Sequence, residues 1–307
     1  MQKRSLVIGM GIGQLYKKVL IEMGHEVSTV DSDPSKGAGY RNMSELRTWA
    51  PLRTAVDTRF TTAHICTPNF THSLLAANVS SMTEILFIEK PGLRSAAEWQ
   101  MLRDMYPFTN IMMVKNNMWR SNIAQMREFA RNAKSVRINW INKARVPNPG
   151  SWFTDKKLAF GGVSRDLMPH LLSLFAAINN RMVPHGYRDA TVTEKRASRV
   201  WNLSDLTGSD YGTVNQNGIY NVDDFCTIDL LLEKPWHLEA NWQSNTEDKV
   251  NIEFDMGGWT ETIELGLCPE EAYKEMIRHA LECRSIPEFW YDQYKVDMWI
   301  HEMIEDL

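Results

Sequence analysis

The feature that most constrains the fold is a glycine-rich turn near the N-terminus, between two runs of different periodicity. The apolar run 5–8 has the composition of a buried parallel strand and is followed by Gly9, Gly11 and Gly13. Apolar residues then recur at helical spacing up to Gly24, which is typical of a helix end. A strand, a glycine turn and a helix in this order predict the first unit of a doubly wound α/β domain.

The first part of the chain continues as strands alternating with helices. After a predicted second strand at 26–31, apolar strand-like runs occur at 62–66, 85–88 and 111–114, with helical segments between them. This alternation predicts a parallel sheet with helices on both faces. We therefore expect a Rossmann domain over residues 1–117.

The pattern changes in the second part of the chain. A strand predicted at 135–143 and four later alternating runs favour a mixed or antiparallel open sheet with one face covered by helices. We expect a C-terminal α+β domain over residues 118–290, and a helix at 291–307 that packs back on the first domain. The four alternating runs are 225–232, 236–242, 250–256 and 260–265.

The glycine turn also predicts a dinucleotide site, because glycines let the backbone approach a pyrophosphate at a helix N-terminus. Asp31 stands 22 residues after Gly9, close to the roughly 20 expected for the carboxylate that binds the adenosine ribose. This carboxylate favours NAD over NADP, since it would repel a 2′-phosphate. Gly13 comes one residue early for the usual spacing, and residue 14 is Gln. The predicted cofactor contacts of this turn are Gly9, Gly11, Ile12, Gly13 and Asp31.

Composition argues against several other classes of protein. The 307 residues carry a formal net charge of −4 and no long basic run, so we expect neither nucleic acid nor a membrane surface as a partner. No segment approaches the roughly 20 apolar residues of a membrane span. The N-terminal apolar run is too short for a signal peptide. The four cysteines are scattered without zinc-like spacing, so we expect no metal site and a cytoplasmic location.

Three further segments carry a resemblance to a known family. They are Thr67-Pro68-Asn69 with His72, then Glu89-Lys90-Pro91, then the double glycine at 161–162 with Asp166 and His170. With the glycine turn, they resemble the glucose–fructose oxidoreductase/inositol dehydrogenase family (Gfo/Idh/MocA) over nearly the whole chain. The resemblance implies an NAD-dependent oxidoreductase that acts on a hydroxyl or keto carbon of a sugar, cyclitol or sugar nucleotide.

The resemblance implies roles for residues of the first domain. Glu89 and Lys90 would lie at the nicotinamide, with Lys90 reaching the substrate oxygen and Pro91 following a bend that is often cis. The loop after the third strand would run along the cofactor toward the nicotinamide. Its residues are Thr67, Pro68 and Asn69, with His72 beginning the next helix.

In the second domain, the resemblance implies a substrate site with Trp152, Asp166 and His170. Because histidine titrates near neutral pH, we prefer His170 as the acid/base, oriented by Asp166, with Lys90 polarising the oxygen. The reverse assignment of Lys90 and His170 stays open. Since Pro169 is tolerated only in the first turn of a helix, Asp166 is also a candidate N-cap. The open sheet face would join the chains of a homodimer or homotetramer.

Two departures from the family pattern leave the substrate class open. Met168 and Pro169 replace small residues, and Ser173 stands where many sugar and cyclitol enzymes have a second Asp. Two alternatives therefore stay beside the carbohydrate dehydrogenase. One is a non-catalytic cofactor-binding regulator, which the presence of Lys90, Asp166 and His170 together speaks against. The other is a reductase of a tetrapyrrole or an imine.

Overall fold

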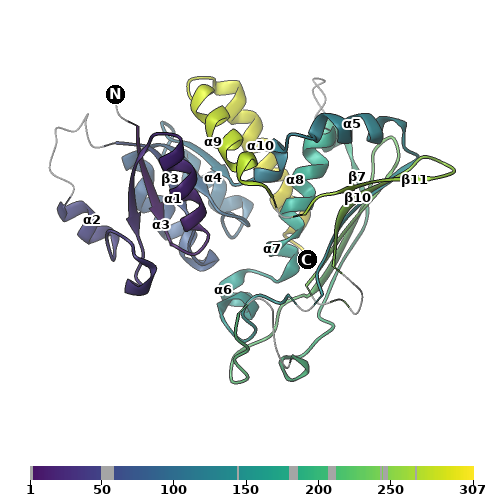
Figure 1. Ribbon diagram of the computed structural model, residues 1–307, viewed down its shortest axis with the longest axis horizontal. Helices are drawn as coiled ribbons and strands as arrows, with labels where there is room; N and C mark the ends of the chain where they lie inside the picture. The colour runs from purple at the N-terminus through teal and green to yellow at the C-terminus, as the bar shows by residue number, and fades with distance from the viewer. Residues whose placement is uncertain are drawn as a thin grey trace. The chain divides into compact units, whose positions relative to one another are not determined.

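The computed structural model of the chain describes residues 3–49, 59–143, 145–179, 186–206, 212–242, 244, 248–266 and 268–307. The chain divides into two compact units. The first comprises Met1–Val114 and Tyr273–Met298, and the second comprises Lys115–Ala272 and Trp299–Leu307. Each unit contains one sheet (Figure 1).

The first unit is built on a parallel sheet of five strands in the order β2-β1-β3-β4-β5. This is a doubly wound order, and it confirms the fold class predicted for this part of the chain. The order reverses between β1 and β3, so the crevice in which such sheets bind ligands lies at the carboxyl ends of these two strands. The strands are β1 (Arg4–Ile8), β2 (Glu26–Val30), β3 (Phe60–Ile65), β4 (Thr83–Ile88) and β5 (Asn110–Met113).

Helices connect the strands of the first unit, and a C-terminal segment completes it. In that segment, the buried carboxylate of Asp297 accepts a hydrogen bond of 3.0 Å from the backbone N–H of Met113, at the end of β5. The helices are α1 (Gly13–Glu22), α2 (Met43–Trp49), α3 (His72–Val79) and α4 (Ala96–Met105), with α9 (Glu270–Glu282) and α10 (Pro287–Ile304) continuing across the division between the units.

The second unit contains a mixed sheet of six strands in the order β11-β10-β6-β9-β8-β7, in which only the β6–β9 pairing is parallel. The helices α5 (Ile123–Asn132) and α8 (Met168–Asn179) lie on one face of this sheet (Figure 1). The strands are β6 (Ser135–Ile141), β7 (Thr191–Ser198), β8 (Phe225–Leu231), β9 (Pro235–Asn241), β10 (Lys249–Asp255) and β11 (Thr260–Glu264).

The inward residues of this sheet form the core of the second unit. Ile138, Ile228, Leu238 and Ile252 are completely buried, and Phe175 of α8 packs edge-on against Trp236 of β9. The alternation of apolar and polar residues that predicted these strands therefore corresponds to one face turned toward the helices.

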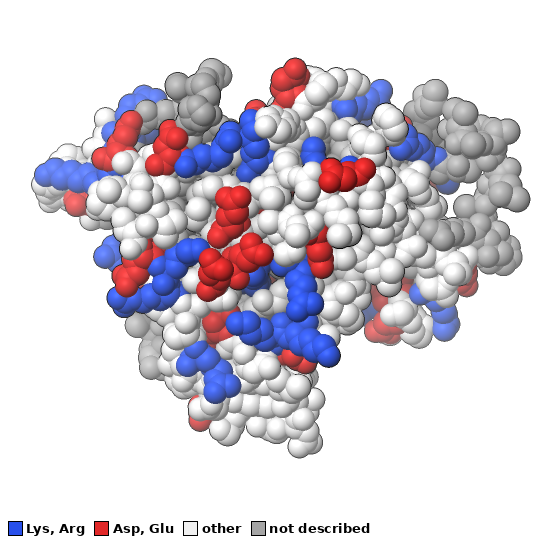
Figure 2. Space-filling model, turned by 180° about the vertical axis from the view of Figure 1, so that it is seen from behind, with Lys and Arg blue, Asp and Glu red and all other residues white. Residues whose placement is uncertain are grey.

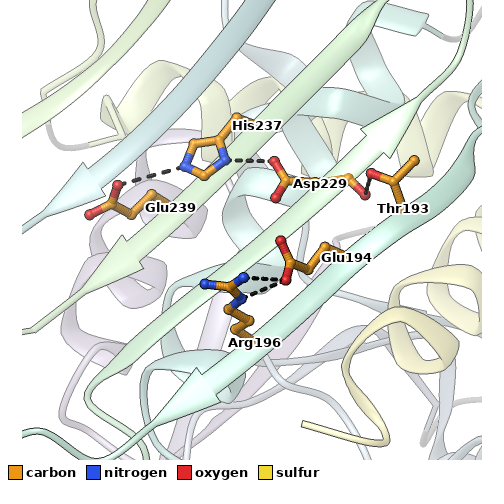
Figure 3. A network of polar contacts seen from close by, with 6 residues as sticks. All are labelled: Thr193, Glu194, Arg196, Asp229, His237 and Glu239. Atoms are coloured by element: carbon orange, nitrogen blue, oxygen red, sulfur yellow. Dashed lines mark hydrogen bonds and ion pairs between the residues drawn. The ribbon is translucent and has the colours of Figure 1, made fainter.

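The opposite face of the sheet is polar (Figure 3). His237 Nδ1 lies 2.7 Å from Asp229 Oδ1, and His237 Nε2 lies 3.7 Å from Glu239 Oε2. The carboxylates of Glu239 and Asp229 raise the pKa of His237. On neighbouring β7, Arg196 pairs with Glu194. The half-buried charges of Asp229, His237 and Glu239 are thus paired with one another, while the pair on β7 is exposed.

The helix near the double glycine begins at a different residue from the one that the sequence suggested as its N-cap. Asp166 is the last residue of the short helix α7 (Val163–Asp166), whose N-cap is Gly162. Asp166 is therefore not an N-cap, and that alternative is wrong. The next helix, α8, begins at Met168, which leaves Pro169 in its first turn, where a missing N–H costs nothing.

A chain of buried polar side chains crosses β1 and β3. Ser5 Oγ lies 2.6 Å from His25 Nδ1 and 2.8 Å from Thr62 Oγ1, which lies 2.9 Å from His64 Nε2. Burial lowers the pKa of His25 to about 4 and that of His64 to about 3. Both rings are therefore neutral in the folded protein, whereas in the unfolded chain they titrate near the ordinary value of about 6.5.

Acid is expected to destabilise the fold through this chain of side chains. Below about pH 6.5 the histidine at position 64 binds a proton in the unfolded chain but not in the folded protein. The free energy of unfolding therefore falls by up to roughly 1.4 kcal/mol for each pH unit of acidification, until the folded pKa is reached. His64→Phe keeps a ring against Phe87 but cannot titrate, so its stability should fall less steeply between pH 7 and pH 4. Urea unfolding at each pH measures this, and His279→Phe, at an exposed histidine, serves as the control. Equal slopes for His64→Phe and wild type would contradict the assignment.

The surface seen in Figure 2 carries Lys and Arg side chains interspersed with Asp and Glu side chains. In the part of the chain that the structure describes, no helix is long and apolar enough to cross a membrane. Within the same described ranges, no group of three or more His, Cys, Asp or Glu residues is placed to hold a metal ion.

Candidate active site

The glycine turn lies where β1 and β3 end. Gly9 has a φ of +89°, and a Cβ added to it would lie 2.6 Å from the backbone oxygen of Cys66, so only glycine fits there. At Gly11, by contrast, nothing lies within 4 Å of the added Cβ position. The helix α1 begins at Gly13, and its N-cap, Ile12, makes no side-chain capping bond. An open backbone at an uncapped helix N-terminus fits the pyrophosphate of a dinucleotide.

Asp31 immediately follows β2 and is hydrogen-bonded to this turn. Its Oδ2 accepts a hydrogen bond of 2.6 Å from the backbone N–H of Met10, and its Oδ1 accepts one of 2.8 Å from the N–H of Asp33. Each carboxylate oxygen has a second lone pair. The half-buried carboxylate can therefore also accept hydrogen bonds from the ribose hydroxyls of NAD, as the sequence predicts.

The loop after β3 is joined to the loop after β4 by His72. This side chain is completely buried, with Nδ1 2.7 Å from the backbone oxygen of Gly92 and Nε2 2.8 Å from that of Thr67. The predicted cofactor residues Thr67, Pro68 and Asn69 are half-exposed. Because the His72 ring is enclosed by protein, we expect it to act on a cofactor indirectly, by fixing these two loops.

The segment after β4 contains the second predicted motif. The Lys90–Pro91 peptide bond is cis, as the resemblance implies. Glu89 is buried, and its carboxylate accepts hydrogen bonds from Tyr16 Oη at 2.6 Å and from the backbone N–H of Lys90 at 3.2 Å. Burial and the neighbouring Glu89 raise the pKa of Tyr16, so this phenol stays protonated and donates. Glu89 is thereby tied to α1, while the Lys90 side chain is half-buried.

The double-glycine segment of the second unit presents two polar side chains. Within residues 161–179, only Asp166 and His170 are half-buried, and all others are buried. Asp166 Oδ2 accepts a hydrogen bond of 2.9 Å from Trp242 Nε1. His170 Nδ1 lies 3.0 Å from Asn117 Nδ2, and its ring stacks on Trp140 with centroids 5.2 Å apart. Each of the two predicted residues is thus held by a partner on another element.

The backbone of this segment is fixed by Asp223, which precedes β8. Its Oδ1 accepts a hydrogen bond of 2.8 Å from the N–H of Gly162, and its Oδ2 accepts one of 2.7 Å from the N–H of Ser164. Asp223 therefore serves as the cap of α7 from a distant part of the chain. The predicted substrate residue Trp152 is half-buried and stacks on its neighbour Phe153, with ring centroids 3.9 Å apart.

Several residues of the candidate site escaped the sequence analysis. A tyrosine on an amphipathic helix and tryptophans on alternating strands are typical of a core, and nothing in their spacing marks them otherwise. Asn117 and Arg120 follow the last strand of the first domain, a position at which polar residues are ordinary turn formers. The residues concerned are Tyr16, Asn117, Arg120, Trp140 and Trp242.

Solved structures establish the fold of the chain. GenD2 from gentamicin A biosynthesis, in complex with NAD, has a TM-score of 0.75 at 16% identity, covering 99% of this chain and 92% of that one. Levoglucosan dehydrogenase, in complex with NADH and levoglucosan, has a TM-score of 0.69 at 16% identity, covering 100% and 97%. The chain therefore has the fold of these two proteins, a parallel-sheet domain and a mixed-sheet domain, as the sequence predicts.

The sequence was also compared with family models and with known proteins. No family model matches the chain. The putative UDP-kanosamine synthase oxidoreductase subunit of Amycolatopsis mediterranei (strain S699) is 26% identical over 184 residues, 57% of this chain and 51% of that protein. The match thus spans about half the length of this relative.

Proposed function

We propose that the chain is an NAD(H)-dependent oxidoreductase of the Gfo/Idh/MocA family that acts on a hydroxyl or keto carbon of a sugar, cyclitol or sugar nucleotide. The observation that carries this proposal is the first unit's glycine turn. It is open at Gly11, begins a helix without a side-chain cap, and is hydrogen-bonded to the carboxylate of Asp31. These are the features that a dinucleotide requires of a doubly wound sheet. GenD2 and levoglucosan dehydrogenase, which share the fold, are known with NAD and NADH.

The cofactor would be held by the turn from Gly9 to Gly13, by Asp31, and by the loop 67–69. When bound, NAD supplies the hydride acceptor, and the protein must then move the proton of the substrate hydroxyl. We propose Lys90 and His170 as the two groups that contact this oxygen. Asp166, held by Trp242, contributes a fixed acceptor for a substrate hydroxyl.

The same segment bears on how a substrate is recognised. Ser173 is completely buried, and its hydroxyl donates to the backbone oxygen of His170 at 2.8 Å. This side chain is therefore hydrogen-bonded within its own helix. Recognition of further hydroxyls must therefore come from other residues, with Trp152 offering an aromatic face for a sugar ring. The relative from Amycolatopsis mediterranei is named for a sugar nucleotide, so sugar nucleotides belong beside free sugars and cyclitols.

We further propose a homodimer or homotetramer that uses the polar face of the second unit's sheet. The residues of this face lie on paired strand positions, such as Asp229 opposite His237, and their charges are of both signs (Figure 3). Such a face suits a partner with the same mixture of charges, namely a second copy. We also propose a cytoplasmic location, because Cys66 and Cys226 are buried free thiols.

Nicotinamide absorbance tests the proposed function. The full chain is incubated with NAD or NADP and a panel of free sugars, cyclitols and UDP-sugars, while calorimetry records cofactor binding. We expect NAD to bind more tightly than NADP, because Asp31 repels a 2′-phosphate, and at least one panel member to produce NADH. Tight binding without turnover on a broad panel would favour a non-catalytic regulator. Failure to bind either cofactor would overturn the proposal.

A further inference from the structure

A three-residue hydrogen-bond chain ends on the predicted acid/base of the second unit. Asn117 lies in a short 3₁₀ helix (Asn116–Trp119), Arg120 follows it directly, and His170 lies in α8. Arg120 Nε donates to Asn117 Oδ1 at 2.7 Å, and Asn117 Nδ2 lies 3.0 Å from His170 Nδ1. Asn117 is completely buried and Arg120 is 7% exposed, so water does not compete for the bond between them.

Arg120 determines the direction of both hydrogen bonds in this three-residue series. A guanidinium has donors only, and its other nitrogens are also directed at acceptors: Nη1 donates to the backbone oxygen of Leu265 at 2.7 Å, and Nη2 to that of Gly266 at 3.2 Å. The oxygen of the Asn117 amide must therefore face Arg120, and its NH₂ group must face His170. An amide NH₂ donates, so His170 Nδ1 accepts.

We propose that Arg120 and Asn117 are positioning residues that hold His170 as the neutral tautomer with its proton on Nε2. Protonating Nδ1 would place two donors face to face. The amide cannot turn over to relieve this, because its NH₂ would then meet the guanidinium. The stacked ring of Trp140, with an interplanar angle of 26°, restricts the plane of the histidine ring.

The tautomer also decides whether His170 or Lys90 accepts the proton of the substrate hydroxyl. This consequence rests on the proposed function. An Nε2–H group can donate a hydrogen bond to the substrate oxygen, but it cannot accept the hydroxyl proton. With bound NAD supplying the hydride acceptor, that proton would instead pass to Lys90 in its amine form, which would become an ammonium as the electron pair of the C–H bond leaves as hydride. This reverses the preference drawn from the sequence, in which His170 was the acid/base.

Nitrogen NMR of the full chain with ¹⁵N-labelled histidine tests the tautomer without cofactor or substrate. The His170 ring, assigned by its loss in His170→Gln, should show a pyridine-type Nδ1 and a pyrrole-type Nε2. We expect this tautomer to be favoured by up to about tenfold at neutral pH, as one net hydrogen bond allows. A protonated Nδ1 in the wild-type protein, alone or as imidazolium, would overturn the proposal.

Asn117→Asp provides the second arm. Its carboxylate would accept a hydrogen bond, so the proton should move to Nδ1 and the two ¹⁵N signals should change type. Asn116→Asp is the matched control, since it adds the same charge one residue away from the contact and should keep the wild-type tautomer. An unchanged ring in a folded Asn117→Asp protein would also overturn the proposal. If the tautomer is as expected but NAD is never reduced, the proposed function fails and the tautomer stands.

Discussion

Replacing Lys90 with methionine is expected to reduce turnover by about a thousandfold or more and to leave NAD binding nearly unchanged. A positioned acid/base contributes roughly a hundredfold to ten-thousandfold to such a reaction, and Lys90 also orients the substrate oxygen. Methionine keeps most of the length of the side chain and removes the amine, and the backbone N–H of residue 90 can still donate to Glu89. Initial rates of NADH formation and calorimetric titration of NAD measure the two quantities separately.

Two companion variants make this result specific. Lys17→Met removes another half-exposed lysine of the same unit, on α1, and should retain wild-type turnover. His170→Gln retains an N–H donor near the position of Nε2, so its loss should be smaller than that of Lys90→Met if Lys90 carries the proton. Turnover preserved in Lys90→Met would remove Lys90 from the chemistry and overturn the assignment of the proton to it.

The fold was predictable because its signals are local. Continuous apolar runs followed by glycine or a turn predicted β1, β3, β4 and β5, and alternation predicted β6 and the strands from β8 to β11. The strand β7 was missed because it lies at the edge of its sheet and is mostly exposed, so residues such as Glu194, Lys195 and Arg196 show no apolar alternation. An edge strand pairs with a single neighbouring strand and often carries charged side chains. It therefore shows little apolar periodicity in the sequence.

The candidate site was predictable only for residues that belong to short motifs. Gly9 and Asp31 follow from the requirements of a phosphate-binding turn, and Lys90 and His170 follow from the resemblance. Their supporting residues come from distant segments: Tyr16 lies 73 residues from Glu89, and Asn117 lies 53 residues from His170. A hydrogen bond between distant segments leaves no spacing rule in a single sequence. Such partners can therefore be identified only from the folded structure.

Gly162→Ala is expected to destabilise the second unit by about 3 kcal/mol and to abolish most activity. A Cβ at residue 162 would lie 1.8 Å from the backbone oxygen of Asp223 and 2.8 Å from its carbonyl carbon. Both are backbone atoms, so no side chain can turn away. Moving Asp223 would strain its two carboxylate bonds to Gly162 and Ser164 and the 2.9 Å bond from Val163 N–H to its carbonyl oxygen.

The displacement would also reach the substrate residues. Asp224 follows Asp223, and its backbone oxygen accepts a hydrogen bond of 3.0 Å from the N–H of Trp242, whose indole holds Asp166. Gly161→Ala should cost less, because its Cβ would meet the side-chain Cγ of Arg165 at 2.6 Å. Gly258→Ala, with nothing within 4 Å, is the control, expected to change stability by no more than about 0.5 kcal/mol. Urea unfolding of the three variants should give this order; equal losses for residues 162 and 258 would refute the close approach of Asp223.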